Sequence, residues 1–105
     1  MSEPSEAADL ELEDRNDTYQ LRLFVAGASS HSVRAIANIK RICDTHLTGR
    51  YSLEIIDVYQ QKQLAESVQL IALPLLIKQA PLPERRFVGD LSDAAKVIKG
   101  LGIIS

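Results

Sequence analysis

The segment 19–59 constrains the fold more than any other part of the chain, because it passes from a strand pattern to a helix pattern and back. The run YQLRLFVAG (19–27) alternates apolar and polar residues, is apolar on its second face near the end, and turns at Gly27, which predicts a central strand. The run SSHSVRAIANIKRICDTHL (29–47) begins with serines that can cap a helix, and Gly49 is placed to end it. Its apolar residues at helical spacing are Val33, Ile36, Ile39, Cys43 and Leu47. With YSLEIIDVY (51–59) as a second strand, we expect a right-handed unit of two parallel strands and a crossover helix.

The second half of the chain predicts one more helix, two antiparallel strands and a terminal element. The run QQKQLAESVQLI (60–71) has helical spacing, and its apolar side comprises Leu64, Val68 and Ile71. Strands are expected at Leu75–Lys78 and Arg86–Val88, joined by the loop PLPE. With a helix at the end, the order is β-α-β-α-β-β-α, which is the order of a thioredoxin-like α/β domain. Pro74 lies just before the third strand, where that fold usually carries a cis-proline.

The final stretch, SDAAKVIKGLGIIS (92–105), is compatible with two structures. Ser92 can cap a helix over Asp93–Lys99, whose apolar residues lie along one face. The same stretch is rich in β-branched residues that favour a strand, and Gly100 and Gly102 interrupt any continuing helix. The residues therefore leave a terminal helix and a terminal strand both open.

Charge divides the chain into an acidic leader and a mildly basic domain. Residues 1–17 carry seven Asp or Glu against one Arg, a net charge of −6, whereas residues 18–105 carry a net charge of +4. We expect a flexible leader followed by a single domain, and the scattered Lys and Arg of that domain argue against nucleic-acid binding. The chain has no apolar run of the roughly 20 residues that a membrane span needs, and its start is not that of a signal peptide. We therefore expect a cytoplasmic protein with no membrane attachment.

Redox catalysis, the usual chemistry of a thioredoxin-like order, needs a low-pKa cysteine at the start of the first helix. That position reads GASSHSV, and the single cysteine, Cys43, lies in the apolar register of the helix, which predicts a buried structural role. His31 and His46 have no acid or cysteine at metal-ligand spacing, and helix capping explains the serines beside His31. The sequence has neither a phosphate-binding glycine loop nor a nucleophile elbow. We expect no catalytic residues, no metal and no cofactor, and interpret the domain as a binding module.

Several motifs together resemble the KaiB family of small clock-associated bacterial proteins. They are LRLFVAG, SVRAI, YSLEIIDVYQQKQLAE, the proline segment IALPLL and ERRFVGDLSDAAKVIKGL, and they span about residues 19–102. The resemblance implies a regulator that binds the ATPase tier of the ring-shaped kinase KaiC, and that in cyanobacterial clocks captures KaiA and displaces the histidine kinase SasA. It also implies two folds: a ground form of order β-α-β-β-α-α-β that self-associates into dimers or tetramers, and a thioredoxin-like monomer that binds KaiC.

The resemblance also assigns roles to individual positions. The expected partner-binding residues are Gln63, Leu64, Glu66, Lys78, Arg85 and Arg86. The expected fold-switching residues are Tyr19, Pro74, Gly89, Asp90, Gly100 and Gly102. For Arg85 and Arg86, a solvated turn pair is the alternative. Because alanine favours a helix over glycine by about 1 kcal/mol, we expect Gly100→Ala to bias the chain toward a helical C-terminus.

The sequence departs from the family pattern at several positions. Gly102 replaces a common Asp, Leu73 replaces the Thr before the proline, and Glu54 replaces a common Lys on a strand that can meet KaiA. These departures suggest a divergent member from a system with KaiC and without KaiA. Two other functions remain open: a glutathione-dependent thioredoxin-like enzyme with a pocket near Ser29 and Pro74, and a sensor module that docks on a histidine kinase.

Overall fold

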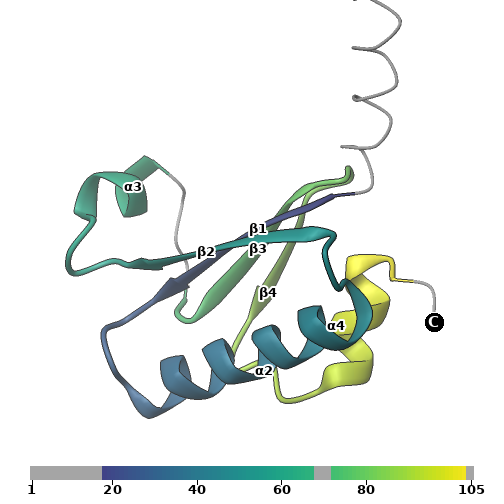
Figure 1. Ribbon diagram of the computed structural model, residues 1–105. Helices are drawn as coiled ribbons and strands as arrows, with labels where there is room; N and C mark the ends of the chain where they lie inside the picture. Colours follow the sequence, from purple (N-terminus) through teal and green to yellow (C-terminus); the bar gives the residue numbers. More distant parts are fainter. Residues whose placement is uncertain (1–17, 68–71, 104–105) are drawn as a thin grey trace, which may run out of the picture.

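The computed structural model describes residues 18–67 and 72–103, which form one four-stranded sheet and three helices around it (Figure 1). In chain order the elements are β1 (Tyr19–Val25), α2 (Ser30–His46), β2 (Tyr51–Asp57), α3 (Lys62–Ser67), β3 (Leu75–Ala80), β4 (Arg85–Val88) and α4 (Ala94–Leu101). This is the expected thioredoxin-like order β-α-β-α-β-β-α, and the terminal segment forms the helix rather than the strand. Residues 68–71, where the expected second helix continues, lie outside the described residues.

The sheet has the strand order β2-β1-β3-β4, so β1 and β3 are central and β2 and β4 form the edges. β1 pairs in parallel with β2 and antiparallel with β3, and β3 pairs antiparallel with β4. Figure 1 shows α2 and α4 on one face of the sheet, with α3 on the other side near the end of β2. The crossover helix α2 thus joins two parallel strands, as the alternation of patterns over 19–59 predicts.

Two apolar cores follow from the alternation of side chains along the strands. The larger core lies between the sheet and the helices α2 and α4, and includes Leu21, Leu23, Ile39, Cys43, Leu76, Val97 and Leu101. The smaller core lies on the opposite face and consists of Phe24, Ile56, Leu75 and Ile77, with Leu64 and Leu73 packed against it. Because β1 contributes to both cores, its two faces are apolar, as its sequence indicates.

The buried side of α2 differs from the predicted one in its first turn. Val33 was expected in the core, but it is 52% exposed, and Ser32 is fully buried in its place. The reason is a polar contact, since the backbone N–H of Ala26 at the end of β1 donates to Ser32 Oγ at 3.1 Å. This bond turns the Ser32 side of the helix toward β1. Further along, Ile39 and Cys43 are fully buried, as predicted.

The ends of α4 also differ from the sequence-based expectation. The N-cap is Asp93 rather than Ser92, because the carboxylate of Asp93 accepts the backbone N–H of Lys96 at 3.2 Å. The helix runs through Gly100 to Leu101 and ends at Gly102, whose φ of +79° is a left-handed conformation that glycine adopts without strain. The two glycines therefore have different roles, one inside the helix and one at its end.

Gly100 lies directly against the aromatic ring of Phe87 on β4. A Cβ placed on Gly100 would lie 2.4 Å from Phe87 Cε2 and 2.8 Å from Phe87 Cζ, both far inside van der Waals contact. The expectation that Gly100→Ala favours this helical C-terminus is therefore revised, because it considered helix propensity alone. In this fold the propensity gain is opposed by a steric conflict with Phe87.

We predict that the effect of Gly100→Ala changes sign with the residue at position 87. In the native background the substitution lowers the free energy of unfolding, because the ring of Phe87 must move. In a Phe87→Leu background, which removes the two ring atoms that conflict, alanine stabilises α4 by up to about 1 kcal/mol. Urea denaturation of the four proteins, followed by helical circular dichroism, gives the coupling between the two sites.

The exposed position Ala95 in the same helix supplies the control. Ala95→Gly removes helix propensity without altering a contact with Phe87, so its cost of about 1 kcal/mol is expected to be the same in both backgrounds. Equal effects of Gly100→Ala in the two backgrounds would contradict the steric explanation.

We also predict that Cys43 reacts slowly with iodoacetamide in the native protein. Its side chain is fully buried, and burial, followed by the nearby charge of Asp44, raises the pKa of the thiol to about 12. The thiolate that attacks the reagent is therefore almost absent at pH 8. Mass spectrometry is expected to show at least tenfold faster alkylation in 6 M urea, and equal rates in the two conditions would be inconsistent with this burial.

Candidate functional site

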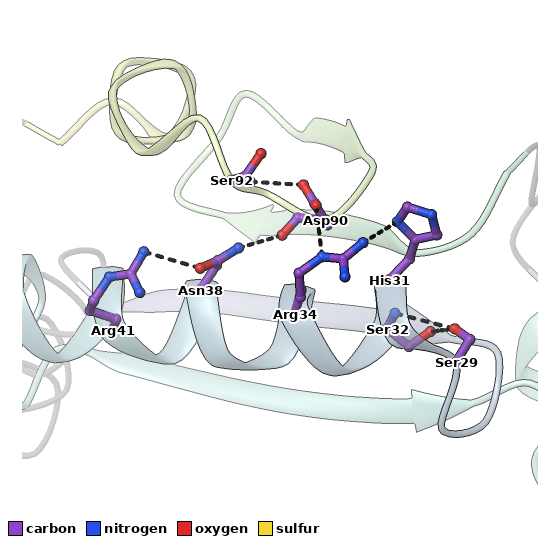
Figure 2. Close-up of polar contacts among 8 residues, drawn as sticks. All are labelled: Ser29, His31, Ser32, Arg34, Asn38, Arg41, Asp90 and Ser92. Carbon is purple, nitrogen blue, oxygen red and sulfur yellow. Dashed lines mark hydrogen bonds and ion pairs between the residues drawn. The ribbon is translucent and has the colours of Figure 1, made fainter.

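The start of α2 is where a thioredoxin-like enzyme places its reactive cysteine, and here it holds three serines, of which Ser29 and Ser32 bond to each other (Figure 2). Ser29 caps the helix, since its Oγ accepts the backbone N–H of Ser32 at 3.2 Å. The same hydroxyl donates to Ser32 Oγ at 2.8 Å, and that oxygen also accepts from Ala26. The two hydroxyls therefore satisfy one another and the local backbone, which is a structural arrangement and confirms the predicted capping.

No base is aligned with these hydroxyls among the described contacts. The imidazole of His31 instead contacts another residue of the same helix, since Arg34 Nη2 donates to His31 Nδ1 at 3.0 Å. The dithiol exchange of thioredoxins needs two cysteines, and the only cysteine of the chain is Cys43, which lies in the core. Within residues 18–67 and 72–103, no three His, Cys, Asp or Glu side chains are grouped so that they could hold a metal ion.

The main polar contact between distant segments joins α2 to the turn before α4. Arg34 Nε donates to Asp90 Oδ2 at 3.2 Å, and Asn38 Nδ2 donates to the backbone carbonyl of Asp90 at 2.8 Å. The other carboxylate oxygen accepts the backbone N–H of Ser92 at 3.1 Å. Figure 2 shows Arg34 and Asn38 projecting side by side from α2 toward this turn. We call these four residues the Asp90 clamp.

The clamp lowers the pKa of Asp90, because hydrogen bonds from Ser92 and then from Arg34 stabilise its carboxylate. It also holds a turn with unusual backbone geometry. Leu91 is buried and has a φ of +61°, a conformation that costs a branched side chain free energy, and Gly89 has a φ of +111°. The strained turn is thus fixed from outside, by two side chains of α2.

Lys78 was expected on the partner surface, but in this fold its side chain lies inside the molecule. It is only 4% exposed, and Nζ donates to the carbonyl of Leu101, at the end of α4, at 3.3 Å. The ammonium also lies 5.8 Å from the centre of the Tyr19 ring. Burial, and then the charge of Arg85, lower its pKa. Lys78 therefore holds the C-terminal end of α4, where a positive charge is favourable.

The remaining expected partner residues, all exposed except Leu64, do not form one patch. Arg85 and Arg86 lie on the edge strand β4 and point to opposite faces, since one lies across from Lys78 and the other across from Ile77. Gln63 and Glu66 are exposed on α3, which follows the opposite edge strand β2 in the chain, while Leu64 is half-buried against the smaller core. As partner contacts these residues remain predictions.

The expected fold-switching residues lie at the connections of the second half of the chain. Tyr19 begins β1, as predicted, and the peptide bond between Leu73 and Pro74 is cis, as expected for this fold. Gly89 donates its backbone N–H to the carbonyl of Pro74 at 3.0 Å, which links the start of β3 to the end of β4. The peptide bonds before Pro81 and Pro83 are also cis. The switching roles themselves remain predictions.

Sequence reasoning missed Arg34 and Asn38. Their spacing of four residues places them on one side of α2, next to its buried stripe. That spacing was a usable signal, but only the folded structure shows that Asp90 is opposite them.

A cleft of about 400 Å³ separates β4 from the turn and the first residues of α4. Its charged lining is mixed, with Arg86 and Lys96 beside Asp90 and Asp93. Such a lining favours neither an anionic nor a cationic ligand, so the cleft does not indicate a cofactor.

Comparison with known proteins places this arrangement in a family. The KaiB domain model matches residues 22–103. The chain is 47% identical over 87 residues to the circadian clock oscillator protein KaiB of Synechococcus elongatus, covering 83% of this chain and 85% of that protein. It is 49% identical over 84 residues to the circadian clock protein KaiB3 of a Synechocystis species, covering 80% and 82%. The chain belongs to the KaiB family.

Among solved structures, chloroplastic thioredoxin z superposes with a TM-score of 0.70 at 21% identity, covering 90% of this chain and 86% of the other. This similarity shows the fold alone. The N-terminal domain of Synechococcus elongatus SasA superposes with a TM-score of 0.65 at 30% identity, covering 82% and 85%. The KaiB domain therefore adopts a thioredoxin-like fold here. In the described residues, no helix has both the length and the apolar character to cross a membrane.

We predict that Arg34→Gln weakens the Asp90 clamp in a pH-dependent manner. Because the folded-state pKa of Asp90 is lowered, its stabilising effect is present above the unfolded pKa and is lost as the pH falls through the folded pKa. The difference in unfolding free energy between the native protein and Arg34→Gln should therefore shrink between about pH 5 and pH 2. Urea denaturation across this range, with an NMR titration of the Asp90 carboxyl carbon, tests both parts.

The exposed residue Lys40 on the same helix provides the control. Lys40→Gln removes a charge of the same sign and is expected to leave the Asp90 titration unchanged. An Asp90 pKa in the native protein equal to that in Arg34→Gln would show that the clamp does not hold the carboxylate.

Proposed function

We propose that this protein is a non-catalytic clock regulator that binds the ATPase ring of a KaiC-type kinase and modulates its phosphorylation cycle. The observation that carries the proposal is the KaiB domain match over residues 22–103, with 47% identity to a circadian clock KaiB. The start of α2 supports it, because Ser29 and Ser32 occupy the position at which a thioredoxin-like enzyme needs a thiol. Whether the kinase runs a circadian clock or a simpler timer depends on its other partners.

The proposed KaiC-binding surface comprises the exposed residues of α3 and β4. Gln63 and Glu66 supply hydrogen-bonding groups on α3, and Arg85 and Arg86 supply positive charge on the edge strand. Arginine on an exposed surface suits bidentate pairing with carboxylates of a partner. In this fold Lys78 is buried and its ammonium holds the end of α4, so its part in the partner surface stays a prediction.

The proposal includes a change of fold before binding. The terminal segment contains β-branched residues and two glycines, so it is also suited to the strand of the other KaiB form. Besides the apolar packing of Val97 and Leu101, polar contacts with distant segments hold both ends of α4, namely the Asp90 clamp at its start and Lys78 at its end. Two packings of one chain within a few kcal/mol of each other are what a switch of this kind requires.

The same proposal extends to the other proteins of a clock system. The likeness to the SasA domain supports a shared docking site, at which this protein and a SasA-like histidine kinase compete for the ring. Glu54 pairs with Arg22 at 3.1 Å on β1 and β2, so the edge that would meet KaiA carries a neutralised ion pair rather than a free lysine. This supports a system without KaiA. In the other fold, self-association into dimers or tetramers is proposed.

Size-exclusion chromatography with the KaiC of the same genome tests the function. With ATP, the protein is expected to co-elute with the kinase ring, and the complex should accumulate slowly because the change of fold precedes binding. The double variant Arg85→Gln, Arg86→Gln should weaken the complex at least tenfold, with Lys40→Gln as the matched control. No complex after a day of incubation would overturn the proposal.

A further inference from the structure

The acidic leader and the domain carry opposite charges, which raises the question of where the leader lies. Residues 1–17 have a net charge of −6, and the remaining residues have a net charge of +4. Two of the domain's arginines already have carboxylate partners, Arg22 with Glu54 at 3.1 Å and Arg34 with Asp90 at 3.2 Å. The positive charge that could attract the leader therefore lies mainly on the other basic side chains of the domain.

The leader joins the domain at a basic end of the sheet. The backbone N–H of Tyr19, the first residue of β1, donates to the carbonyl of Arg50 at 2.8 Å. The ring of Tyr19 lies 5.8 Å from Lys78 Nζ, and Lys78 in turn bonds to the last residue of α4. Figure 1 shows that the start of β1, the β3–β4 turn and the end of α4 lie at the same end of the molecule.

Four cations gather at this end, which we call the basic end: Arg50, Lys78, Arg85 and Lys99. Arg50 and Arg85 are exposed, and Lys99 is exposed in the last turn of α4. Lys78 and Arg85 lie directly opposite one another on β3 and β4, which is an unfavourable pairing of like charges.

Two acids lie near the basic end and leave it positive. Asp44 accepts the hydroxyl of Tyr51 at 2.7 Å and so is partly occupied. Glu84 precedes Arg85 in the chain and is exposed. The positive charge thus exceeds the negative by two in this region, next to the attachment point of the leader.

We propose that residues 1–17 dock on the basic end of their own domain, with their carboxylates against Arg85, Lys99 and Arg50. Both the acidic leader and the basic end belong to this chain, and the leader joins the domain at Tyr19, next to the basic end. The leader also offsets the repulsion between Arg85 and Lys78, which favours this fold.

The leader is long enough to make this contact. Arg85 is two strand spacings from β1, roughly 10 Å across the sheet. An extended chain spans about 3.3 Å per residue, so Asp14 reaches about 13 Å from residue 18 and Glu11 reaches about 23 Å. A short tether also keeps the carboxylates at an effective concentration in the millimolar range, so weak ion pairs suffice. Arg85 on an exposed edge strand is then contested between the leader and any acidic partner.

A spin label in the leader tests the docking in the full-length protein. Ala7→Cys introduces a thiol for the label in the leader, and Cys43 does not compete for the nitroxide because it is buried with a raised pKa. Amide signals near Arg50, Arg85 and Lys99 are expected to lose at least twice as much intensity as in a leader whose seven acids and Arg15 are all changed to Gln or Asn, which makes its net charge zero. That neutral leader supplies the broadening caused by the tether alone.

Two controls define the contact. Arg85→Gln with Lys99→Gln should reduce the broadening to that of the neutral leader, whereas Lys40→Gln with Lys62→Gln, away from the basic end, should not. Salt at 0.5 M should have the same effect as the neutral leader, because it screens exposed ion pairs.

Equal broadening in the native and neutral leaders would overturn the proposal. So would broadening that appears when spin-labelled protein is mixed with isotope-labelled protein, since it would place the leader on a second copy.

Discussion

The contact between Gly100 and Phe87 determines how closely α4 approaches the sheet. A side chain at Gly100 would lie 2.4 Å from the ring, so the helix packs at this distance only because the residue has no Cβ. The close approach brings Leu101 into the larger core and places its carbonyl 3.3 Å from the ammonium of Lys78. A buried cation is costly unless it is satisfied, and the C-terminal carbonyl of a helix satisfies it. One small residue thus makes both the apolar and the polar contacts of the helix end possible.

At its start, α4 depends on the first half of the chain. The turn that precedes it contains Leu91 with a φ of +61°, and the contacts that hold this turn come from Arg34 and Asn38 on α2. The first three elements, strand, helix and strand, have the same order in both forms proposed for this family. If the second half of the chain changes fold, as we propose, α2 remains as a support and the Asp90 clamp forms or breaks as a unit. The side chains of the clamp are polar and either exposed or half-buried, so separating them uncovers little apolar surface of their own.

Sequence patterns predicted the element order because it depends on local signals: alternation in the strands, helical spacing in α2 and capping by Ser29. The burial of Cys43 followed from the same spacing. Sequence patterns were less informative where contacts with a segment distant in the sequence determine which side chains are buried. Val33 is exposed because Ser32 bonds to Ala26 at the end of β1, and Lys78 is buried because α4 ends above it. A pattern within one helix or strand contains no information on which segment will lie opposite it.

The candidate site shows the same difference between what local sequence patterns predict and what contacts with distant segments determine. Local chemistry was enough to predict that the chain does not carry out dithiol exchange, since one cysteine cannot form a dithiol, and in the structure the serine hydroxyls at the start of α2 bond to each other. Sites on exposed side chains were assigned only through the family resemblance, and the structure places one group on the helix α3 and the other on the edge strand β4. A partner that contacts both α3 and β4 must therefore span the sheet or bind after the elements rearrange. The charge pattern favours β4 as the first point of encounter, because Arg85 and Arg86 carry positive charge on an exposed edge and long-range attraction acts before any close fit is made.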